Sequence, residues 1–201
     1  LNALAELYRI KGEYNKAEPL YLESLNIQKK VLGKEHSEYV KGLYNLGVLY
    51  ALKGDYDKAE SLFLEAKAIQ EKMLGKEHPD YANSLYGLAN LYDFKGEYDK
   101  AVPLFLEAKS IYEKTTGKES QGYAASLNSL AELYKDLGED DKAEPLYLEA
   151  IAILEKTLGK ESPGYAMILC NLAGIYKKNG EYDKAELLYL EAKTVLEKLL
   201  E

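Results

Sequence analysis

The 201-residue sequence is poor in cysteine, in long apolar runs and in basic side chains. Its one cysteine, Cys170, excludes an internal disulfide framework and favours a reducing compartment. No apolar run approaches the roughly 20 residues that a membrane-spanning helix needs. A secretory signal pattern is also missing, and the sequence opens within a repeat and without Met. We therefore expect a cytoplasmic protein that has no membrane partner.

The charge balance argues against a nucleic-acid partner. The chain carries 26 Lys and Arg against 34 Asp and Glu, which gives a formal net charge of −8 at pH 7. Recognition of a phosphate backbone depends on clustered Lys and Arg side chains. We therefore expect no binding to nucleic acid.

The sequence does contain a 42-residue unit that is repeated almost five times. Three columns of identical residues follow this interval: Leu1, Leu43, Leu85, Leu127 and Leu169; Tyr8, Tyr50, Tyr92, Tyr134 and Tyr176; Ala17, Ala59, Ala101, Ala143 and Ala185. Such a period is typical of a solenoid, in which each unit buries its apolar face against its neighbours. We expect one array over residues 1–201, cut from a longer repeat protein, with units at about 1–36, 37–78, 79–120, 121–162 and 163–201.

Each unit is expected to form two helices, which makes the protein all-α with about ten helices and no strands. In the second unit, the apolar spacing predicts a first helix over Ser37–Lys53. A second helix is predicted to open with Asp57 as its N-cap and to end at Leu74. The equivalent N-caps are Asn15, Asp99, Asp141 and Asp183. Turns are expected near nine glycines: Gly12, Gly33, Gly54, Gly75, Gly96, Gly117, Gly138, Gly159 and Gly180.

Two histidines occupy equivalent positions one unit apart. His36 and His78 are followed at the same interval by Ser120 and Ser162. A metal site needs ligands that converge on one ion, and successive loops of a solenoid lie too far apart for that. We interpret these residues as helix N-caps, in which His and Ser are interchangeable.

No pattern in the sequence indicates catalysis. Cys170 has no histidine near it in sequence. A column of glutamates recurs in mid-helix, where a solvated or salt-bridging role is favoured: Glu23, Glu65, Glu107, Glu149 and Glu191. No nucleophile elbow, phosphate-binding loop or Cys/His ligand cluster is present. We predict that the chain is not an enzyme and has no catalytic, cofactor or metal site.

One pattern in the second unit carries a family resemblance. It consists of Leu43, Leu46, Gly47, Tyr50, Gly54, Tyr56, Ala59, Phe63 and Ala66. This pattern resembles the tetratricopeptide repeat. The 42-residue length is similar to the long-helix subclass found in kinesin light chains, nephrocystin-like proteins and many bacterial multidomain proteins. The resemblance covers the whole chain. It implies a right-handed superhelix of helix pairs, whose first helices line a concave groove that binds extended peptides or partner helices.

One arc of each first helix varies between units in a way that packing does not require. Its centre is aromatic and apolar, and its far end is basic, which suggests a surface that binds an apolar segment followed by acidic residues. The asparagines on it are suited to hold a peptide backbone. The candidate groove residues are Tyr44, Asn45, Val48, Leu52, Tyr86, Asn90, Phe94, Asn128, Glu132, Lys135, Asn171, Lys177 and Lys178. An alternative is that Leu52 and Phe94 tuck under neighbouring helices.

Three functions remain open from the sequence. The leading one is a protein–protein interaction scaffold with a protein or peptide ligand. The alternative is the regulatory or sensor arm of a multidomain bacterial enzyme, such as a caspase-like protease or a signalling protein, whose catalytic domain lies outside this chain. An engineered consensus array is disfavoured, because the solvent faces vary irregularly. Self-association through uncapped ends is also expected.

Overall fold

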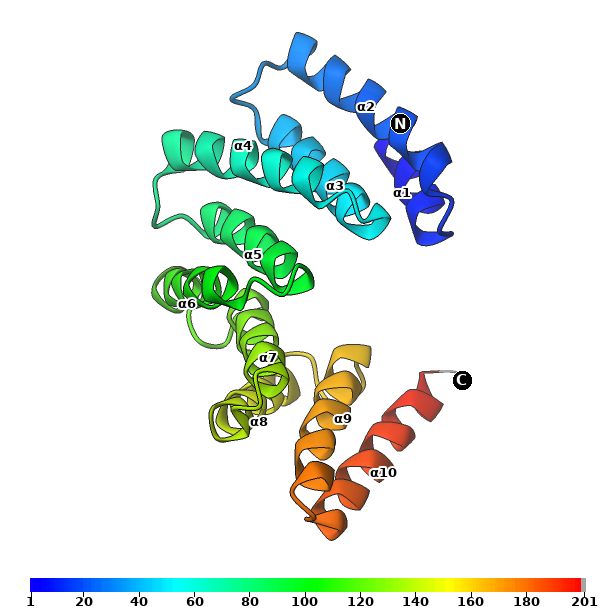
Figure 1. Cartoon of the computed structure of the whole chain (residues 1–201), viewed down its shortest axis with the longest axis vertical. Helices are drawn as coiled ribbons and strands as arrows, with labels where there is room; N and C mark the ends of the chain where they lie inside the picture. The colour runs from blue at the N-terminus through cyan, green and yellow to red at the C-terminus, as the bar shows by residue number, and fades with distance from the viewer. Residues whose placement is uncertain (200–201) are drawn as a thin grey trace. The chain divides into compact units, whose positions relative to one another are not determined.

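The computed structural model describes residues 1–199 and contains ten helices in that range. They are α1 (Asn2–Ile10), α2 (Tyr14–Val31), α3 (Ser37–Lys53), α4 (Tyr56–Leu74), α5 (Pro79–Phe94), α6 (Tyr98–Thr115), α7 (Gln121–Asp136), α8 (Asp140–Thr157), α9 (Pro163–Lys178) and α10 (Tyr182–Lys198) (Figure 1). Helices account for 82% of the chain, and no strand occurs in the described residues. The predicted all-α fold with about ten helices is confirmed, while the hand of the superhelix stays a prediction.

Successive helices in this range are separated by short turns that contain a glycine at positive φ. Gly54 ends α3 in the left-handed conformation, with φ of 80° and ψ of 7°. Gly75 follows α4 with φ of 81°. A Cβ atom would make both conformations costly, and this is why glycine closes the helices here. All nine predicted turn glycines have positive φ, and no described helix continues across any of them.

Four of the first helices begin with a side-chain cap. Nδ1 of His36 and Nδ1 of His78 each accept a hydrogen bond from the backbone N–H two residues further on, at 3.2 Å and 3.1 Å. Oγ of Ser120 and Oγ of Ser162 accept from the backbone N–H three residues further on, at 3.3 Å and 3.2 Å. The interpretation of this column as N-caps is therefore confirmed.

The predicted N-caps of the second helices are wrong by two residues. Helix α4 begins at Tyr56, and its N-cap is Asp55, which makes no side-chain capping bond. Asp57 lies instead within the first turn. A carboxylate there still interacts favourably with the positive end of the helix dipole. The acidic column therefore marks the start of the helix without capping it.

Residues 1–104 form the first of two compact units. In this unit α1 packs on α2, α2 on α3, α3 on α4, and α4 on α5 (Figure 1). The ring of Phe63 is buried between helices. Gly47 leaves room for it, because a Cβ on Gly47 would lie 2.8 Å from Cε1 of that ring. A small residue on α3 thus allows an aromatic side chain of α4 to fill the space between the two backbones.

The second compact unit begins at residue 105, so the division falls within α6. Here α7 packs on α8, α8 on α9, and α9 on α10. The core uses the same repeat positions as the first unit, with Leu127, Leu130, Leu133 and Tyr147 buried. Each unit therefore has its own continuous apolar core, built from nearest-neighbour helix contacts.

Tyrosine hydroxyls link neighbouring helices to the glutamate column. The bonds run from Tyr39 to Glu65 at 3.2 Å, from Tyr123 to Glu149 at 2.9 Å, and from Tyr165 to Glu191 at 2.8 Å. Glu65 also pairs with Lys34 at 2.8 Å, and Glu191 with Lys160 at 2.9 Å. These contacts confirm the salt-bridging role for Glu65 and Glu191. They also explain why tyrosine, whose hydroxyl needs a partner when buried, is so frequent in this chain.

The first helix exposes positions that are buried in the interior of the array. Leu4 and Leu7 on α1 are about half-exposed, whereas the equivalent Leu46 and Leu49 on α3 are buried. Self-association through the ends stays a prediction. The prediction of self-association also involves Leu200, which lies outside the described residues.

The alanine column predicts a packing defect that mutation can produce. Ala101 on α6 is fully buried, so Ala101→Leu is expected to overpack this position and to lower the free energy of unfolding by about 1–3 kcal/mol. Chemical denaturation checks the result. Ala68→Leu, at an exposed position of α4, is the control and is expected to change stability little. Equal stability of the Ala101 variant and the wild type would contradict the burial of this column.

Candidate binding groove

The first helices of residues 1–104 carry three neighbouring pockets that all include Tyr44. One of about 370 Å³ lies among α3, the end of α4 and the start of α5. A second of about 190 Å³ lies between α3 and α5, and a third of about 350 Å³ lies between α1 and α3. Together we call them the α1–α3–α5 groove. Seven of the candidate residues line it: Tyr44, Asn45, Val48, Leu52, Tyr86, Asn90 and Phe94.

Tyr44 is held at the centre of this groove by aromatic packing. Its ring lies 5.3 Å from that of Phe63, centroid to centroid, with the planes tilted by 55°. Gly87 on α5 makes the space, because a Cβ there would lie 2.7 Å from Cε2 of Tyr44. Burial raises the pKa of the Tyr44 hydroxyl, and the nearby Tyr86 hydroxyl contributes. Tyr44 therefore stays neutral at physiological pH.

The 190 Å³ pocket is the most apolar part of the groove. Val48, Leu52, Phe63 and Phe94 line it together with Tyr44. Phe94 is 71% exposed and Leu52 is 44% exposed, so neither side chain tucks under a neighbouring helix. Exposed aromatic and aliphatic side chains beside a pocket are a feature of protein-binding surfaces.

The pocket between α1 and α3 is polar on its α1 side. Glu6 accepts hydrogen bonds from Nε of Arg9 at 2.8 Å and from the Tyr21 hydroxyl at 2.6 Å. These bonds from Arg9 and Tyr21 lower the pKa of Glu6 to about 2. The carboxylate is therefore charged at neutral pH, but the guanidinium balances its charge. The side-chain carbonyl oxygen of Asn2 is buried here and has no hydrogen-bond partner among the described residues.

In residues 105–199 the candidate residues form a separate polar group. The amide of Asn171 donates to Glu132 at 2.8 Å, and Lys135 donates to the Asn171 side-chain oxygen at 3.5 Å. Asn128 is only 8% exposed. The helices α7 and α9, which carry these residues, are in contact. Asn171, Glu132 and Lys135 are thus hydrogen-bonded to one another, whereas the side-chain oxygen of Asn128 is buried without a hydrogen-bond partner among the described residues. Fewer polar atoms of this group face solvent than the sequence predicts.

The basic end of the candidate set is partly neutralised. Lys178 on α9 forms an ion pair with Asp140 at 2.6 Å. Lys177 is exposed. Only one of the two lysines is therefore available, without exchange of partners, to an acidic segment.

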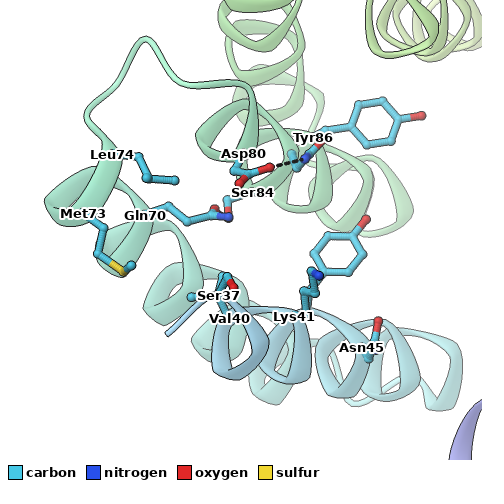
Figure 2. A pocket seen from close by; sticks show the side chains of 12 residues that line it. Ser37, Val40, Lys41, Asn45, Gln70, Met73, Leu74, Asp80, Ser84 and Tyr86 are labelled. Atoms are coloured by element: carbon cyan, nitrogen blue, oxygen red, sulfur yellow. Dashed lines mark hydrogen bonds between the residues drawn. The ribbon is translucent and has the colours of Figure 1, made fainter. Parts of the chain in front are cut away.

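One side of the 370 Å³ pocket lies outside the residues predicted from the sequence. Gln70, Met73 and Leu74 reach it from the last turn of α4, and Asp80 and Ser84 reach it from the start of α5 (Figure 2). The residues predicted from the sequence all lie on one arc of the first helices. The column that contains Gln70 could have indicated this, because it holds Gln28 in α2 and Gln70 in α4 but Tyr112 in α6 and Leu154 in α8.

Across residues 1–199, no three His, Cys, Asp or Glu side chains are grouped so that they would hold a metal ion. Among the same residues, no helix combines the length and the apolar character that crossing a bilayer requires.

Paired helices that stack through nearest-neighbour contacts define the class of α-helical repeat proteins. Within this class, residues 1–72, 39–114 and 122–198 match the family model described as tetratricopeptide repeat. The chain belongs to the tetratricopeptide repeat family. None of the curated proteins matches it in sequence.

Solved structures are similar over nearly the whole chain. A putative kinesin light chain with nearly identical repeats, from Podosopora anserina, is 30% identical with a TM-score of 0.75, over 98% of this chain and 94% of that one. BtubC (BKLC) from P. vanneervenii is 27% identical with a TM-score of 0.81, over 98% and 78%. The Rap conjugation gene regulator of plasmid pLS20, in complex with the Phr* peptide, is 15% identical with a TM-score of 0.80, over 97% and 52%. The last of these is a likeness of fold alone.

Proposed function

We propose that this chain is a non-catalytic protein-interaction module, and that the α1–α3–α5 groove of residues 1–104 binds an extended peptide segment. The observation that carries the proposal is the convergence of three pockets on Tyr44, with Phe94 and Leu52 exposed beside them. Aromatic side chains at the centre of an interface usually carry most of its binding energy. A peptide ligand would bury these rings and hydrogen-bond Asn45 along its backbone.

The fold is compatible with such a ligand. The Rap regulator, which shares the fold at 15% identity, is a protein in complex with the Phr* peptide. That likeness carries no residue correspondence to this chain. In residues 105–199, the group of Asn171, Glu132 and Lys135 offers a polar site of its own to a protein ligand, with Lys177 as its free cation. We place the protein in the cytoplasm, because one cysteine in 201 residues fits a reducing compartment.

A second candidate function is the sensor arm of a larger protein. The chain corresponds to only 52% of the Rap regulator, so an array of this length also occurs as one part of a longer chain. A catalytic or signalling domain in the same reading frame would favour this candidate. The groove would then serve as its ligand sensor.

The test uses a peptide selected on the wild-type protein from a random displayed library. Tyr44→Ala and Phe94→Ala are each expected to weaken binding of that peptide by about 30-fold or more, which corresponds to about 2 kcal/mol. Titration calorimetry measures the affinity. Phe94 is largely exposed, so its removal is expected to leave the helix content unchanged, and circular dichroism checks this.

The matched control is Leu64→Ala, which removes a 45%-exposed apolar side chain from α4, outside the groove. It is expected to leave the affinity within about twofold. If Leu64→Ala abolishes binding while the Tyr44 and Phe94 variants bind normally, the peptide lies on the second helices and the groove assignment is wrong. A library that yields no binder on the folded protein would count against the peptide ligand itself.

A further inference from the structure

The 370 Å³ pocket lies where two facing repeat positions, those of Gln70 on α4 and Ser84 on α5, both hold polar residues. The column of Gln70 holds Tyr112 in α6 and Leu154 in α8, and both of these side chains are buried. The ring of Tyr112 lies so close to Gly122 that a Cβ there would be 2.7 Å from its Cε1 atom. The column of Gln70 also holds Gln28 in α2, and the Ser84 column holds Gly42, Ser126 and Ile168. Where α6 and α8 place a large side chain, α4 places a polar amide. The space beside it remains open.

The walls of this pocket are apolar, whereas its inner end is polar. Val40, Met73 and Leu74 face the opening from α3 and α4, with Tyr44 and Tyr86 on the groove side. Figure 2 shows the Gln70 side chain extending toward Ser84. The Ser84 hydroxyl donates to Oε1 of Gln70, and Ser84 is only 2% exposed. The side-chain N–H groups of Gln70 donate to none of the described residues, so they remain available as hydrogen-bond donors.

The charges that surround the pocket are close to balanced. Lys41 lines it and pairs with Glu38 at 2.9 Å. Asp80 lies at the start of α5, where the helix dipole is positive, and it accepts a hydrogen bond from Asn83 at 3.4 Å. The Lys41 ammonium is thus paired with a carboxylate, and the exposed Asp80 carboxylate lies at the positive end of α5, so the net charge beside the pocket is small. The electrostatics favour an uncharged occupant.

We propose that this pocket takes a phenol ring, as the tyrosine side chain of the bound peptide. A volume of about 370 Å³ is at the lower end of the range for ligand pockets, so it suits one ring rather than a larger molecule. The apolar walls desolvate the ring, and a buried hydroxyl needs a hydrogen-bond partner. The Gln70 amide supplies that partner. The peptide context of the ring rests on the proposed function; the pocket itself does not.

The first experiment uses free p-cresol as the probe and the methionine methyl groups as reporters. The chain has two methionines, Met73 in the pocket and Met167 on α9. In protein with ¹³C-labelled methionine methyls, p-cresol is expected to shift the Met73 signal with a Kd of about 1 mM and to leave Met167 unchanged. Toluene lacks the hydroxyl and is expected to bind about 5-fold more weakly, because it cannot form the hydrogen bond to Gln70. A Met73 signal that does not move, or equal binding of the two probes, would overturn the proposal.

Variants that copy other repeats provide the matched controls. Gln70→Tyr reproduces the residue of α6, and Ser84→Ile reproduces Ile168 of α9; each is expected to fill the pocket and to abolish the Met73 shift. Two fillers are used so that misfolding of one leaves the other informative. Gln70→Leu, which copies α8, is expected to remove the preference for p-cresol over toluene. Persistence of the shift in both fillers would place the probe elsewhere.

The peptide arm separates this proposal from the proposed function. In a peptide selected on the wild-type protein, replacing its tyrosine by phenylalanine is expected to weaken binding about 5-fold on wild type and not on Gln70→Leu. If the selected peptides contain no tyrosine, or if Gln70→Tyr binds them as wild type does, the ring assignment fails while the groove stands. If no peptide binds, the proposed function fails, and the p-cresol titration still decides whether the pocket recognises a phenol.

Discussion

Phe63→Ala is expected to lower the free energy of unfolding by about 3–5 kcal/mol. The ring is 2% exposed and lies at the meeting point of three helices. It approaches Gly47 of α3 closely, and a Cβ on Gly87 of α5 would lie 3.4 Å from its Cε1 atom. Because both facing residues are glycines, the cavity has no side chain on these two sides that could move in, and the Tyr44 ring that packs on Phe63 is left to relax toward it. The loss therefore lies at the upper end for a large-to-small substitution.

Urea unfolding, followed by circular dichroism, measures this effect. The control is Leu64→Ala at the adjacent position, which removes a side chain that is 45% exposed and should cost about 1 kcal/mol or less. Equal losses for the two variants would mean that the ring of Phe63 is not a core element. Phe63→Ala should also loosen Tyr44, whose ring packs on Phe63 at 5.3 Å.

The repeat explains why so much of the fold was predictable. A glycine that recurs nine times at turn positions, as Gly54 and Gly75 illustrate, leaves little doubt about where helices end, and positive φ confirms each one. The N-caps of the second helices were predicted two residues too late, as Asp57 in place of Asp55 shows. Asp55 and Asp57 both favour the positive end of a helix, so an acidic column alone does not identify which residue precedes the first turn.

The groove was predictable only in part, because burial on a repeat position depends on its neighbours. Tyr44 and Asn128 occupy the same column. Tyr44 is partly exposed beside three pockets because Gly87 leaves space for its ring, whereas Asn128 is buried. The contribution of Gln70 requires knowing that the last turn of α4 lies beside the start of α5. No periodicity within one helix contains that information.

The repeat also places two tyrosines in equivalent positions with opposite hydrogen-bonding outcomes. Tyr21 on α2 is buried, and its hydroxyl donates to Glu6 at 2.6 Å. Tyr147 on α8 is 0% exposed, and its hydroxyl has no hydrogen-bond partner among the described residues. The equivalent carboxylate, Glu132, accepts from Asn171 instead. Burial accordingly raises the pKa of Tyr147 well above its ordinary range.

Phenylalanine at these two positions is therefore expected to change stability in opposite directions. Tyr21→Phe removes a hydrogen bond to a charged group and should lower the free energy of unfolding by about 1.5–3 kcal/mol. Tyr147→Phe removes a buried, unpaired hydroxyl and should raise it by about 1–3 kcal/mol.

The repeat indicates that a phenylalanine ring fits at positions 21 and 147, since the same column holds Phe63 and Phe105. Denaturant midpoints of the two variants against wild type measure both signs. A loss of stability in Tyr147→Phe would mean that the Tyr147 hydroxyl is hydrogen-bonded in solution. If Glu132 were its partner, Glu132→Gln would lower the stability of the wild type but not that of the Tyr147→Phe variant.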